Sequence, residues 1–240
     1  SQCIAAECCI AVYSALEFLM YDFHSHTFLS DGVLSPIELI RRAYVRGYEA
    51  IGVTDHVGIG NLELVVKTLV KECELASYRW DILAVPGVDI THVPKEDIDL
   101  VAVTAKKLGA KLVIVHGQTV VEPVEQGTNH AAIKSPNVDV LAHPGLIERD
   151  DAKLAAENGV FLEISARKGH SLANGHVVKI ALEMGARMLI DSDAHTPDDL
   201  LTQEIISNVA RGSGIPDDLI YTVTHQNPLT LIGRLGITRA

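Results

Sequence analysis

The sequence predicts an α/β protein, a single barrel of the (β/α)7 type with parallel strands inside and helices outside. Seven apolar, β-branched runs recur along the 240 residues, they alternate with stretches of helical periodicity, and no break in composition divides them. Strand–helix units that arrive roughly every 20–35 residues are typical of such barrels. A chain of this length can bury the large core that one α/β domain needs.

Each apolar run is expected to form a buried parallel strand, because the runs are continuously apolar rather than alternating with polar residues. Strands of this kind are covered on both faces, by the barrel interior and by the helices. The seven expected strands are Met20–Phe23, Ala50–Thr54, Ile82–Val88, Lys111–Val115, Val138–Ala142, Val160–Ile164 and Arg187–Ile190.

Between the strands, apolar residues recur with the period of a helix. Ser35, Pro36 and Glu38 have the pattern of a helix start, and Gly47 that of a helix end. The polar stretch Val121–Ser135 is too long for a tight turn and is expected to form a lid. The other expected helices are Leu62–Ala76, Asp97–Leu108, Asp150–Asn158, Leu172–Met184, Pro197–Ala210 and a terminal helix, Asn227–Gly236, across the bottom or side of the barrel.

Residues 1–19 are expected to form an N-terminal helical extension, and residues 20–240 a single barrel domain. The extension is apolar, but it lacks a basic start and contains Glu7 and Glu17, which argues against a signal peptide. Four cysteines without a CxxC pair favour a reduced, cytoplasmic protein, and no stretch predicts a membrane span. The net charge of −11 argues against non-specific binding of nucleic acid.

Side chains that can ligate metal ions follow the carboxyl ends of nearly all the expected strands. His24 and His26 are two residues apart, and Asp193 and His195 repeat that spacing, so each pair can point to one side of its strand. Barrel enzymes build their active sites at this end of the strands, and imidazoles and carboxylates together hold divalent metal ions. The predicted ligands are His24, His26, Asp31, His56, Asp89, His116, His143, Asp193 and His195.

Asp55 and His56 are adjacent and therefore point in opposite directions along a strand. We expect His56 to be a ligand and Asp55 to orient it as part of the catalytic set. A single histidine after a strand is more often a core group, but His116 and His143 occupy equivalent places, which favours ligation. His92 is as compatible with a surface role as with a functional one.

A polar segment after the sixth expected strand predicts contacts with an anionic substrate. Arg167 and Lys168 can pair with phosphate oxygens, and Lys134 in the expected lid is a third candidate for substrate binding. We expect Arg167 also to act in catalysis, and His170 and His176 to bind substrate or serve as general acid. A solvated loop is the alternative for this segment. Asp191, two residues before Asp193, is a weak candidate ligand.

The sequence resembles the PHP (polymerase and histidinol phosphatase) family of metal-dependent phosphoesterases. The resemblance covers about residues 20–200, in the family's order, and its finer features look like a stand-alone, archaeal-type, histidinol-phosphatase-like branch. The motifs that carry it are His24-Ser25-His26, Ser30-Asp31-Gly32, Thr54-Asp55-His56, Gly87-Val88-Asp89, His116, His143-Pro144 and Asp193-Ala194-His195.

The resemblance implies a distorted (β/α)7 TIM-like barrel of the PHP fold that holds two or three divalent ions, Zn, Mn or Fe. Asp89 would bridge two ions, although the family more often has Glu at this position, and the shorter side chain puts the number of ions in doubt. The implied sets are His24, His26, Asp89 and Asp193 for one ion, Asp89, His116 and His143 for a second, and Asp31, His56 and His195 for a third.

The predicted function is hydrolysis of phosphomonoesters of small metabolites by a metal-activated water. A metal-dependent nuclease or phosphodiesterase is the main alternative, and a barrel that serves only as a scaffold is a weaker one. An amidohydrolase of the carbamylated-lysine type is disfavoured, because no lysine ends an expected strand. The expected partner is a small phosphorylated substrate, and the oligomeric state stays open.

Overall fold

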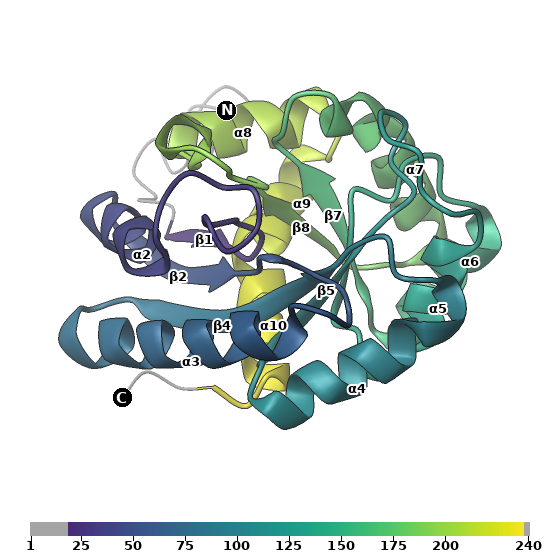
Figure 1. Cartoon of the computed structure of the whole chain (residues 1–240). Coiled ribbons are helices and arrows are strands. Elements are labelled where there is room, and N and C mark those ends of the chain that lie inside the picture. Colours follow the sequence, from purple (N-terminus) through teal and green to yellow (C-terminus); the bar gives the residue numbers. More distant parts are fainter. Residues whose placement is uncertain (1–18, 238–240) are drawn as a thin grey trace, which may run out of the picture.

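A parallel sheet curls into a nearly closed barrel, with its strands following one another in sequence order (Figure 1). The structure, a computed structural model, describes residues 19–237. Seven strands pair in order around the sheet, and the short β3 continues the line of β2 and pairs with β4. This confirms the predicted fold class. The strands are β1 (Met20–Asp22), β2 (Tyr48–Val53), β3 (His56–Val57), β4 (Leu83–Ile90), β5 (Leu112–His116), β6 (Val140–Ala142), β7 (Phe161–Ser165) and β8 (Met188–Asp191).

The segments that follow β1 and β8 close the barrel at the carboxyl ends of the strands. Ser25 and Ala194 form an isolated parallel bridge, and the backbone N–H of His26 donates to the carbonyl of Ala194 over 2.8 Å. This pairing places the first histidine pair beside the segment that contains Asp193 and His195, although about 170 residues separate them in the sequence.

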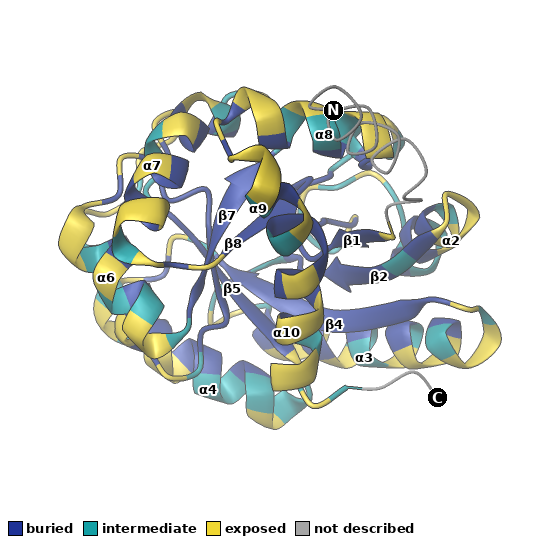
Figure 2. Ribbon diagram, turned by 180° about the vertical axis from the view of Figure 1, so that it is seen from behind, coloured by how far each residue is buried: buried dark blue, intermediate teal, exposed yellow. Residues whose placement is uncertain are grey.

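The helices surround the barrel, and their exposed faces point away from the sheet (Figure 2). Short helical turns lie between several of the longer helices. The helices are α2 (Pro36–Val45), α3 (Leu62–Arg79), α4 (Ile98–Leu108), α5 (Thr128–Lys134), α6 (Arg149–Asn158), α7 (Asn174–Met184), α8 (Gln203–Gly212), α9 (Asp217–Tyr221) and α10 (Asn227–Arg234). The turns are η1 (Lys95–Asp97), η2 (His170–Ala173), η3 (Pro197–Asp199) and η4 (Thr222–Gln226).

Two predicted segments differ from the structure. The second half of the expected lid Val121–Ser135 forms α5, so the loop between β5 and α5 is shorter than predicted. The helix expected from Pro197 begins only at Gln203, because Thr196 and Asp199 form a capping box around η3 and the Thr202 side chain then starts α8. The five-residue α9 was not predicted, since it is too short to show a helical period.

The barrel interior is apolar at the amino ends of the strands and polar at their carboxyl ends. Leu112 and Ile114 belong to the inner cluster, and His116 follows at the next inward position of β5. Along β8, Leu189 belongs to the inner cluster and Asp191 follows at the next inward position. Asp193 comes two residues after the end of this strand. Leu231 of α10 joins this cluster, and Figure 2 shows α10 lying across the strands. The terminal helix thus closes the end opposite the polar groups.

The predicted helical extension lies outside the described residues, apart from Leu19, so its separation from the barrel stays a prediction. No helix within residues 19–237 combines the length and apolarity that a membrane span requires.

Gly145 sits where two loops of the barrel end meet, and replacing it with Ala is expected to destabilise the protein. Its φ is +63°, and a Cβ there would lie 2.0 Å from the carbonyl oxygen of Gln118. We expect the free energy of unfolding to fall by about 2 kcal/mol or more for Gly145→Ala. Denaturant unfolding measures this. Gly212→Ala is the control, since a Cβ there meets nothing within 4 Å, and its effect should stay below about 1 kcal/mol.

Candidate metal centre

The nine predicted ligands come together at the carboxyl ends of the strands. Six are buried, His56 and His195 are partly accessible, and Asp31 is exposed, with 53% of its side chain accessible. Their side chains form overlapping groups whose ligand atoms lie within 4.8 Å of one another. The groups that contain these residues are His26, Asp31, His56 and His195; His24, His26 and Asp193; His56, Asp89 and His116; His92, His116 and Glu122; and His143, His170 and Asp193.

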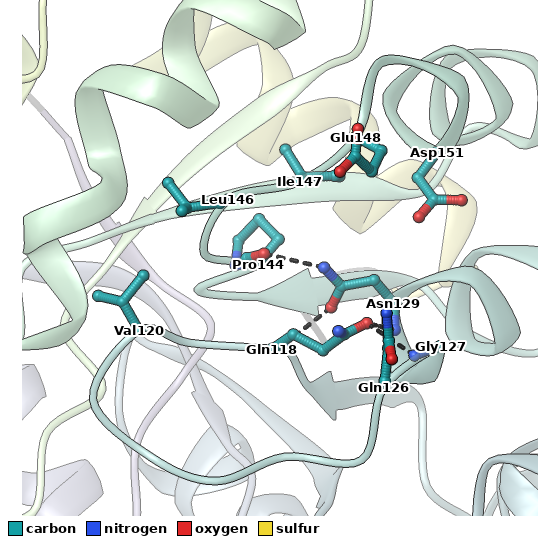
Figure 3. Close-up of a pocket in the computed structure, with 10 residues that line it drawn as sticks. All are labelled: Gln118, Val120, Gln126, Gly127, Asn129, Pro144, Leu146, Ile147, Glu148 and Asp151. Carbon is teal, nitrogen blue, oxygen red and sulfur yellow. Dashed lines mark hydrogen bonds between the residues drawn. The ribbon is translucent and has the colours of Figure 1, made fainter.

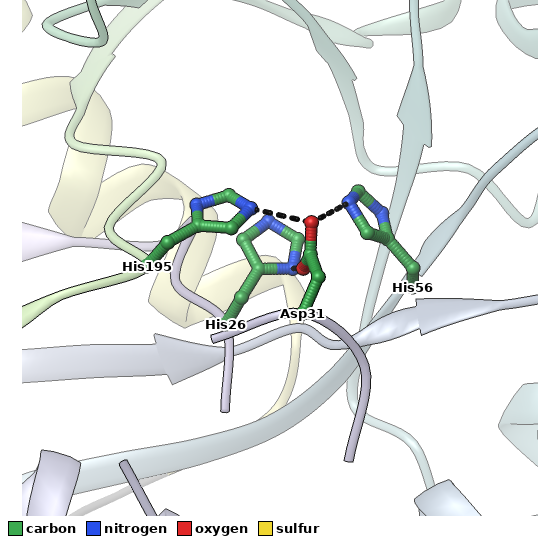
Figure 4. A group of neighbouring side chains, drawn as sticks. All are labelled: His26, Asp31, His56 and His195. Carbon is green, nitrogen blue, oxygen red and sulfur yellow. Dashed lines mark hydrogen bonds and ion pairs between the residues drawn. The ribbon is translucent and has the colours of Figure 1, made fainter. Parts of the chain in front are cut away.

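The outermost group surrounds the carboxylate of Asp31 (Figure 4). Its Oδ2 lies 3.0 Å from Nε2 of His195 and 3.6 Å from Nε2 of His56, and its Oδ1 lies 3.9 Å from Nδ1 of His26. Three imidazoles from separate segments of the chain therefore face one carboxylate, an arrangement of four donors suited to a tetrahedral metal ion.

Asp193 lies at the centre of the site, and its two oxygens face different neighbours. Oδ1 is 3.1 Å from Nε2 of His26 and 3.7 Å from Nε2 of His24. Oδ2 is 3.7 Å from Nε2 of His170 and 3.9 Å from Nε2 of His143. Asp193 and His143 both have positive φ, 53° and 26°, a costly backbone for residues other than glycine that often marks functional positions.

Asp89 makes the second carboxylate junction. Its Oδ2 lies 2.9 Å from Nδ1 of His56 and 3.6 Å from both Nε2 of His24 and Nδ1 of His116. The resemblance implied that Asp89 and His143 share an ion. Within the described chain, His143 instead forms its ion-pair contact with Asp193.

Several buried imidazole nitrogens in the site make no hydrogen bond of good geometry within the described part of the chain. They are both ring nitrogens of His26, His116 and His143 and Nε2 of His24. Two of them nevertheless lie close to a carboxylate oxygen, Nε2 of His26 at 3.1 Å and Nε2 of His116 at 2.9 Å. A buried polar atom without a partner costs about 1–3 kcal/mol, so this many together are unfavourable unless another group satisfies them. Metal ions would do so, and the donor set of imidazoles and carboxylates fits them.

Charges in the site divide the histidines into two kinds. Burial lowers the pKa of His26 to about 3, and burial together with His116 lowers the pKa of His143 well below its usual value. Burial also opposes the charge on His56 and His24. Hydrogen bonds with Asp31 and Asp89 nevertheless raise the pKa of His56 to about 10, and the charge of Glu163 raises that of His24. The neutral histidines can accept a cation at once, and the charged ones must first lose a proton.

Glu163 is a site residue that the sequence reasoning missed. It is fully buried on β7, and its Oε2 lies 2.6 Å from Nδ1 of His24. A carboxylate that binds the second nitrogen of a ligating histidine fixes its orientation and tautomer. The signal was a charged residue inside the apolar run from Val160 to Ile164, where a strand buried on both faces should carry none.

Replacing Glu163 with Gln is expected to weaken metal binding without removing a ligand. Gln keeps the size of the side chain but loses the charge that holds Nδ1 of His24, and such a loss typically costs about 10–100-fold in affinity or activity. Titration with Zn²⁺ against a chromophoric chelator measures this. Unchanged affinity would show that Glu163 only fills the interior.

Asp55 does not orient His56, so that prediction was wrong. Its carboxylate accepts hydrogen bonds from the backbone and hydroxyl of Thr27, at 2.8 and 2.7 Å, and from the hydroxyl of Ser30 at 2.6 Å. Asp55 therefore fixes the loop that presents Asp31. The residue that contacts Nδ1 of His56 besides Asp89 is Thr91, at 2.7 Å.

Two predicted substrate or acid residues lie away from the cluster. Lys134 is exposed in the last turn of α5, which leads back to the amino ends of the strands, at the opposite face of the barrel. The Nε2 of His176 contacts the carbonyl of Ile147 at 2.8 Å and so joins α7 to a neighbouring loop. Helix geometry, which sequence spacing did not capture, directs both side chains elsewhere.

Arg167 lies in the site, as predicted, while Lys168 is exposed beside it. The Nη1 of Arg167 donates to the backbone carbonyl of Asp193 over 3.1 Å, and its side chain remains 32% accessible. Glu122, on the loop after β5, lies 2.9 Å from Nε2 of His116 through its Oε2 and was not predicted. His92 is exposed at the rim of the site and forms a group with His116 and Glu122.

A cavity of about 340 Å³ lies between the loop after β5 and the start of α6 (Figure 3). Gln118 and Pro144, which line it, follow the ligand candidates His116 and His143 by two residues and one residue. Leu146 contributes an apolar wall. The cavity therefore borders the segments that carry these two histidines, although none of the nine predicted ligands lines it, and it is large enough for a small organic group.

The comparison with curated proteins gives full-length relatives. The chain is 44% identical over 218 residues to an uncharacterized protein of Methanocaldococcus jannaschii, MJ1295, covering 90% of this chain and all of that protein. It is 32% identical over 226 residues to the probable phosphatase Teth514_1060 of a Thermoanaerobacter species, covering 84% of this chain and 89% of that protein. No family model matches the chain.

Solved structures with the same fold include metal-dependent phosphatases. The tyrosine phosphatases YwqE of Bacillus subtilis and CpsB of Streptococcus pneumoniae give a TM-score of 0.61 at 20% identity, over 92% of this chain and 97% of the matched one. A histidinol phosphate phosphatase of Lactococcus lactis, solved with zinc, L-histidinol and phosphate, gives 0.53 at 14% identity, over 91% and 94%. The phosphatase relative, 32% identical over most of both chains, decides the assignment: the chain belongs to the family of these probable phosphatases.

Proposed function

We propose that this protein binds two or three divalent metal ions and uses them to hydrolyse phosphomonoesters of small metabolites. The observation that carries the proposal is the set of buried imidazole nitrogens that make no well-aligned hydrogen bond and are arranged around two carboxylates. The phosphatase relatives support the reaction class, and the cavity beside the cluster supports a small leaving group. Among Zn, Mn and Fe, the donor set does not favour one strongly.

The ligands would be the nine residues that the sequence predicts. Asp193 and Asp89, each facing several imidazoles, would join neighbouring ions, and Asp31 would hold the most exposed one with His56 and His195. Divalent ions in such sites lower the pKa of water toward neutrality and offset the charge that develops on a transferring phosphoryl group.

Arg167 is the candidate for direct contact with the substrate phosphate. One nitrogen of its guanidinium is used by the carbonyl of Asp193, which fixes the side chain at the edge of the cluster. Its accessible donors can pair with phosphoryl oxygens as charge builds on them. The exposed Lys168 beside it would add to the attraction of an anionic substrate.

Metal binding is expected to weaken as the pH falls and to release protons. Hydrogen bonds with Asp31 and Asp89 raise the pKa of His56 to about 10, so this imidazole carries a proton at pH 7 that a metal ion must displace, and the charge of Glu163 raises the pKa of His24 in the same direction. Each displaced proton should lower the apparent affinity about tenfold per unit decrease in pH. Calorimetric titrations in buffers of different ionisation enthalpy count these protons. Binding that is independent of pH between 6 and 8 would contradict the assignment.

The test of the function is a screen with each metal in turn. The purified protein is loaded with Zn²⁺, Mn²⁺ or Fe²⁺ and incubated with a panel of phosphorylated metabolites and with short single-stranded oligonucleotides. We expect release of inorganic phosphate from at least one small phosphomonoester. Release of mononucleotides with no hydrolysis of the small esters would establish the nuclease alternative instead, and no hydrolysis of either with full metal content would favour a scaffold.

A further inference from the structure

His170 stands among the predicted metal ligands although neither the motif pattern nor the resemblance placed it there. It lies in η2, the turn after β7, and is only 5% exposed. Its ring is stacked on that of His143, with the centroids 4.1 Å apart and the planes 15° from parallel. With His143 and Asp193 it forms a group of three buried donors.

The donor distances in this group are close to those of a metal site. From Oδ2 of Asp193, Nε2 of His170 lies 3.7 Å away and Nε2 of His143 lies 3.9 Å away. Two ligands that each lie about 2.0–2.2 Å from a tetrahedral ion are roughly 3.3–3.6 Å apart, so these separations are near those of coordination. Coordination by both rings would also require the two nearly parallel imidazoles to tilt toward one ion. The other oxygen of Asp193 faces a different pair of histidines.

The second nitrogen of His170 has the partner that a ligating histidine requires. Its Nδ1 lies 2.7 Å from the hydroxyl of Thr119, a residue that is 7% exposed on the loop after β5. A histidine whose Nδ1–H donates to such a hydroxyl presents its Nε2 lone pair in a fixed direction. Here Nε2 lies 3.7 Å from Oδ2 of Asp193 and 3.7 Å from Oε1 of Glu122. His24, with Glu163 on Nδ1 and Asp193 near Nε2, has the same construction.

We propose that His170 is a metal ligand, and that with His143 and Asp193 it holds one of the ions, while Thr119 positions its ring. This inference rests on the metal binding proposed above. Within the described residues, Asp193 is the carboxylate in ion-pair contact with His143, and His170 would supply a further donor to the same ion.

The test measures coordination directly, by replacing His170 with Cys and loading the protein with Co²⁺. A thiolate bound to Co²⁺ gives a charge-transfer absorption that imidazole ligands do not give. We expect His170→Cys to show a new band of this kind relative to the wild type. His176→Cys is the matched control, since His176 bonds a backbone carbonyl outside the cluster and should give no new band.

Metal content provides a second readout that does not depend on activity. Elemental analysis after gel filtration should find about one metal equivalent per chain fewer in His170→Ala, or an affinity at least about tenfold weaker, and an intermediate loss in Thr119→Val. His176→Ala should retain the wild-type content. If His170→Ala fails to fold, Thr119→Val and the Cys variant still decide the question.

The outcomes separate this inference from the general proposal. Wild-type metal content in His170→Ala, with no cobalt–thiolate band in His170→Cys, would overturn the ligand role. If His170→Ala, with wild-type metal content, hydrolysed esters with poor leaving groups more slowly than the wild type but p-nitrophenyl phosphate at the wild-type rate, His170 would be the general acid. A wild-type protein that binds no metal at all would contradict the proposed function as well.

Discussion

Removal of metal ions is expected to abolish hydrolysis and to lower the thermal stability of the protein. Without cations, the buried nitrogens of His26, His116 and His143 make no well-aligned hydrogen bond in the described chain, and acidic side chains crowd one pocket. A ligand present at about 1,000 times its Kd stabilises a protein by about 4 kcal/mol, which corresponds to roughly 10 °C in Tm at this size. Scanning calorimetry and a phosphate-release assay, before and after dialysis against EDTA, measure both effects.

The controls for this experiment are metal-saturated EDTA and reloading. EDTA that already holds Zn²⁺ should leave activity and Tm unchanged, and a stoichiometric addition of metal to the stripped protein should restore both. Full activity in a protein shown by elemental analysis to be metal-free would refute the mechanism.

Replacement of Asp193 with Asn is expected to be the most damaging single change in the site. Asn keeps the shape but removes the negative charge that faces His24 and His26 through one oxygen and His143 through the other. We expect kcat/KM to fall on the order of 10³-fold, with a parallel loss of metal. Steady-state kinetics on the best substrate of the screen, together with metal analysis, give both numbers.

Asp191→Asn is the matched control, because it makes the same chemical change two residues earlier, at the last residue of β8. Burial and the charge of Asp22 raise the pKa of Asp191 well above its usual value, so burial already disfavours the charged form that Asn removes. An amide preserves the bond that it accepts from the N–H of Phe23, at 2.6 Å. Its kcat/KM should stay within about tenfold of the wild type. Equal losses in the two variants would mean that general disruption, and not the role of Asp193, explains the effect.

The barrel could be predicted from the sequence because its strands are buried on both faces. Continuous apolar runs mark such strands plainly, and the glycines after α4, α6 and α7 adopt the left-handed conformation that a helix end favours. The predictions failed where local capping overrode periodicity. The capping box of Thr196 and Asp199 and the cap at Thr202 divide a helix that the pattern presented as continuous.

The gathering of the metal candidates could also be anticipated, since every strand of a parallel barrel delivers its carboxyl end to the same face. The hydrogen-bond partners of each side chain could not be anticipated. Asp55 accepts hydrogen bonds from Thr27 and Ser30 rather than from His56, and His176 contacts the carbonyl of Ile147. Such choices depend on loop positions that are fixed by the whole fold, and alternation along a strand does not extend into loops.

The most direct test of the account is a crystal structure of the metal-loaded protein, with anomalous scattering measured at the absorption edge of the bound metal. We predict two or three anomalous peaks at the carboxyl ends of the strands, each about 2.0–2.3 Å from imidazole nitrogens or carboxylate oxygens of this cluster. An active protein whose histidines are surrounded only by water, or whose metal peaks lie elsewhere on the molecule, would contradict it.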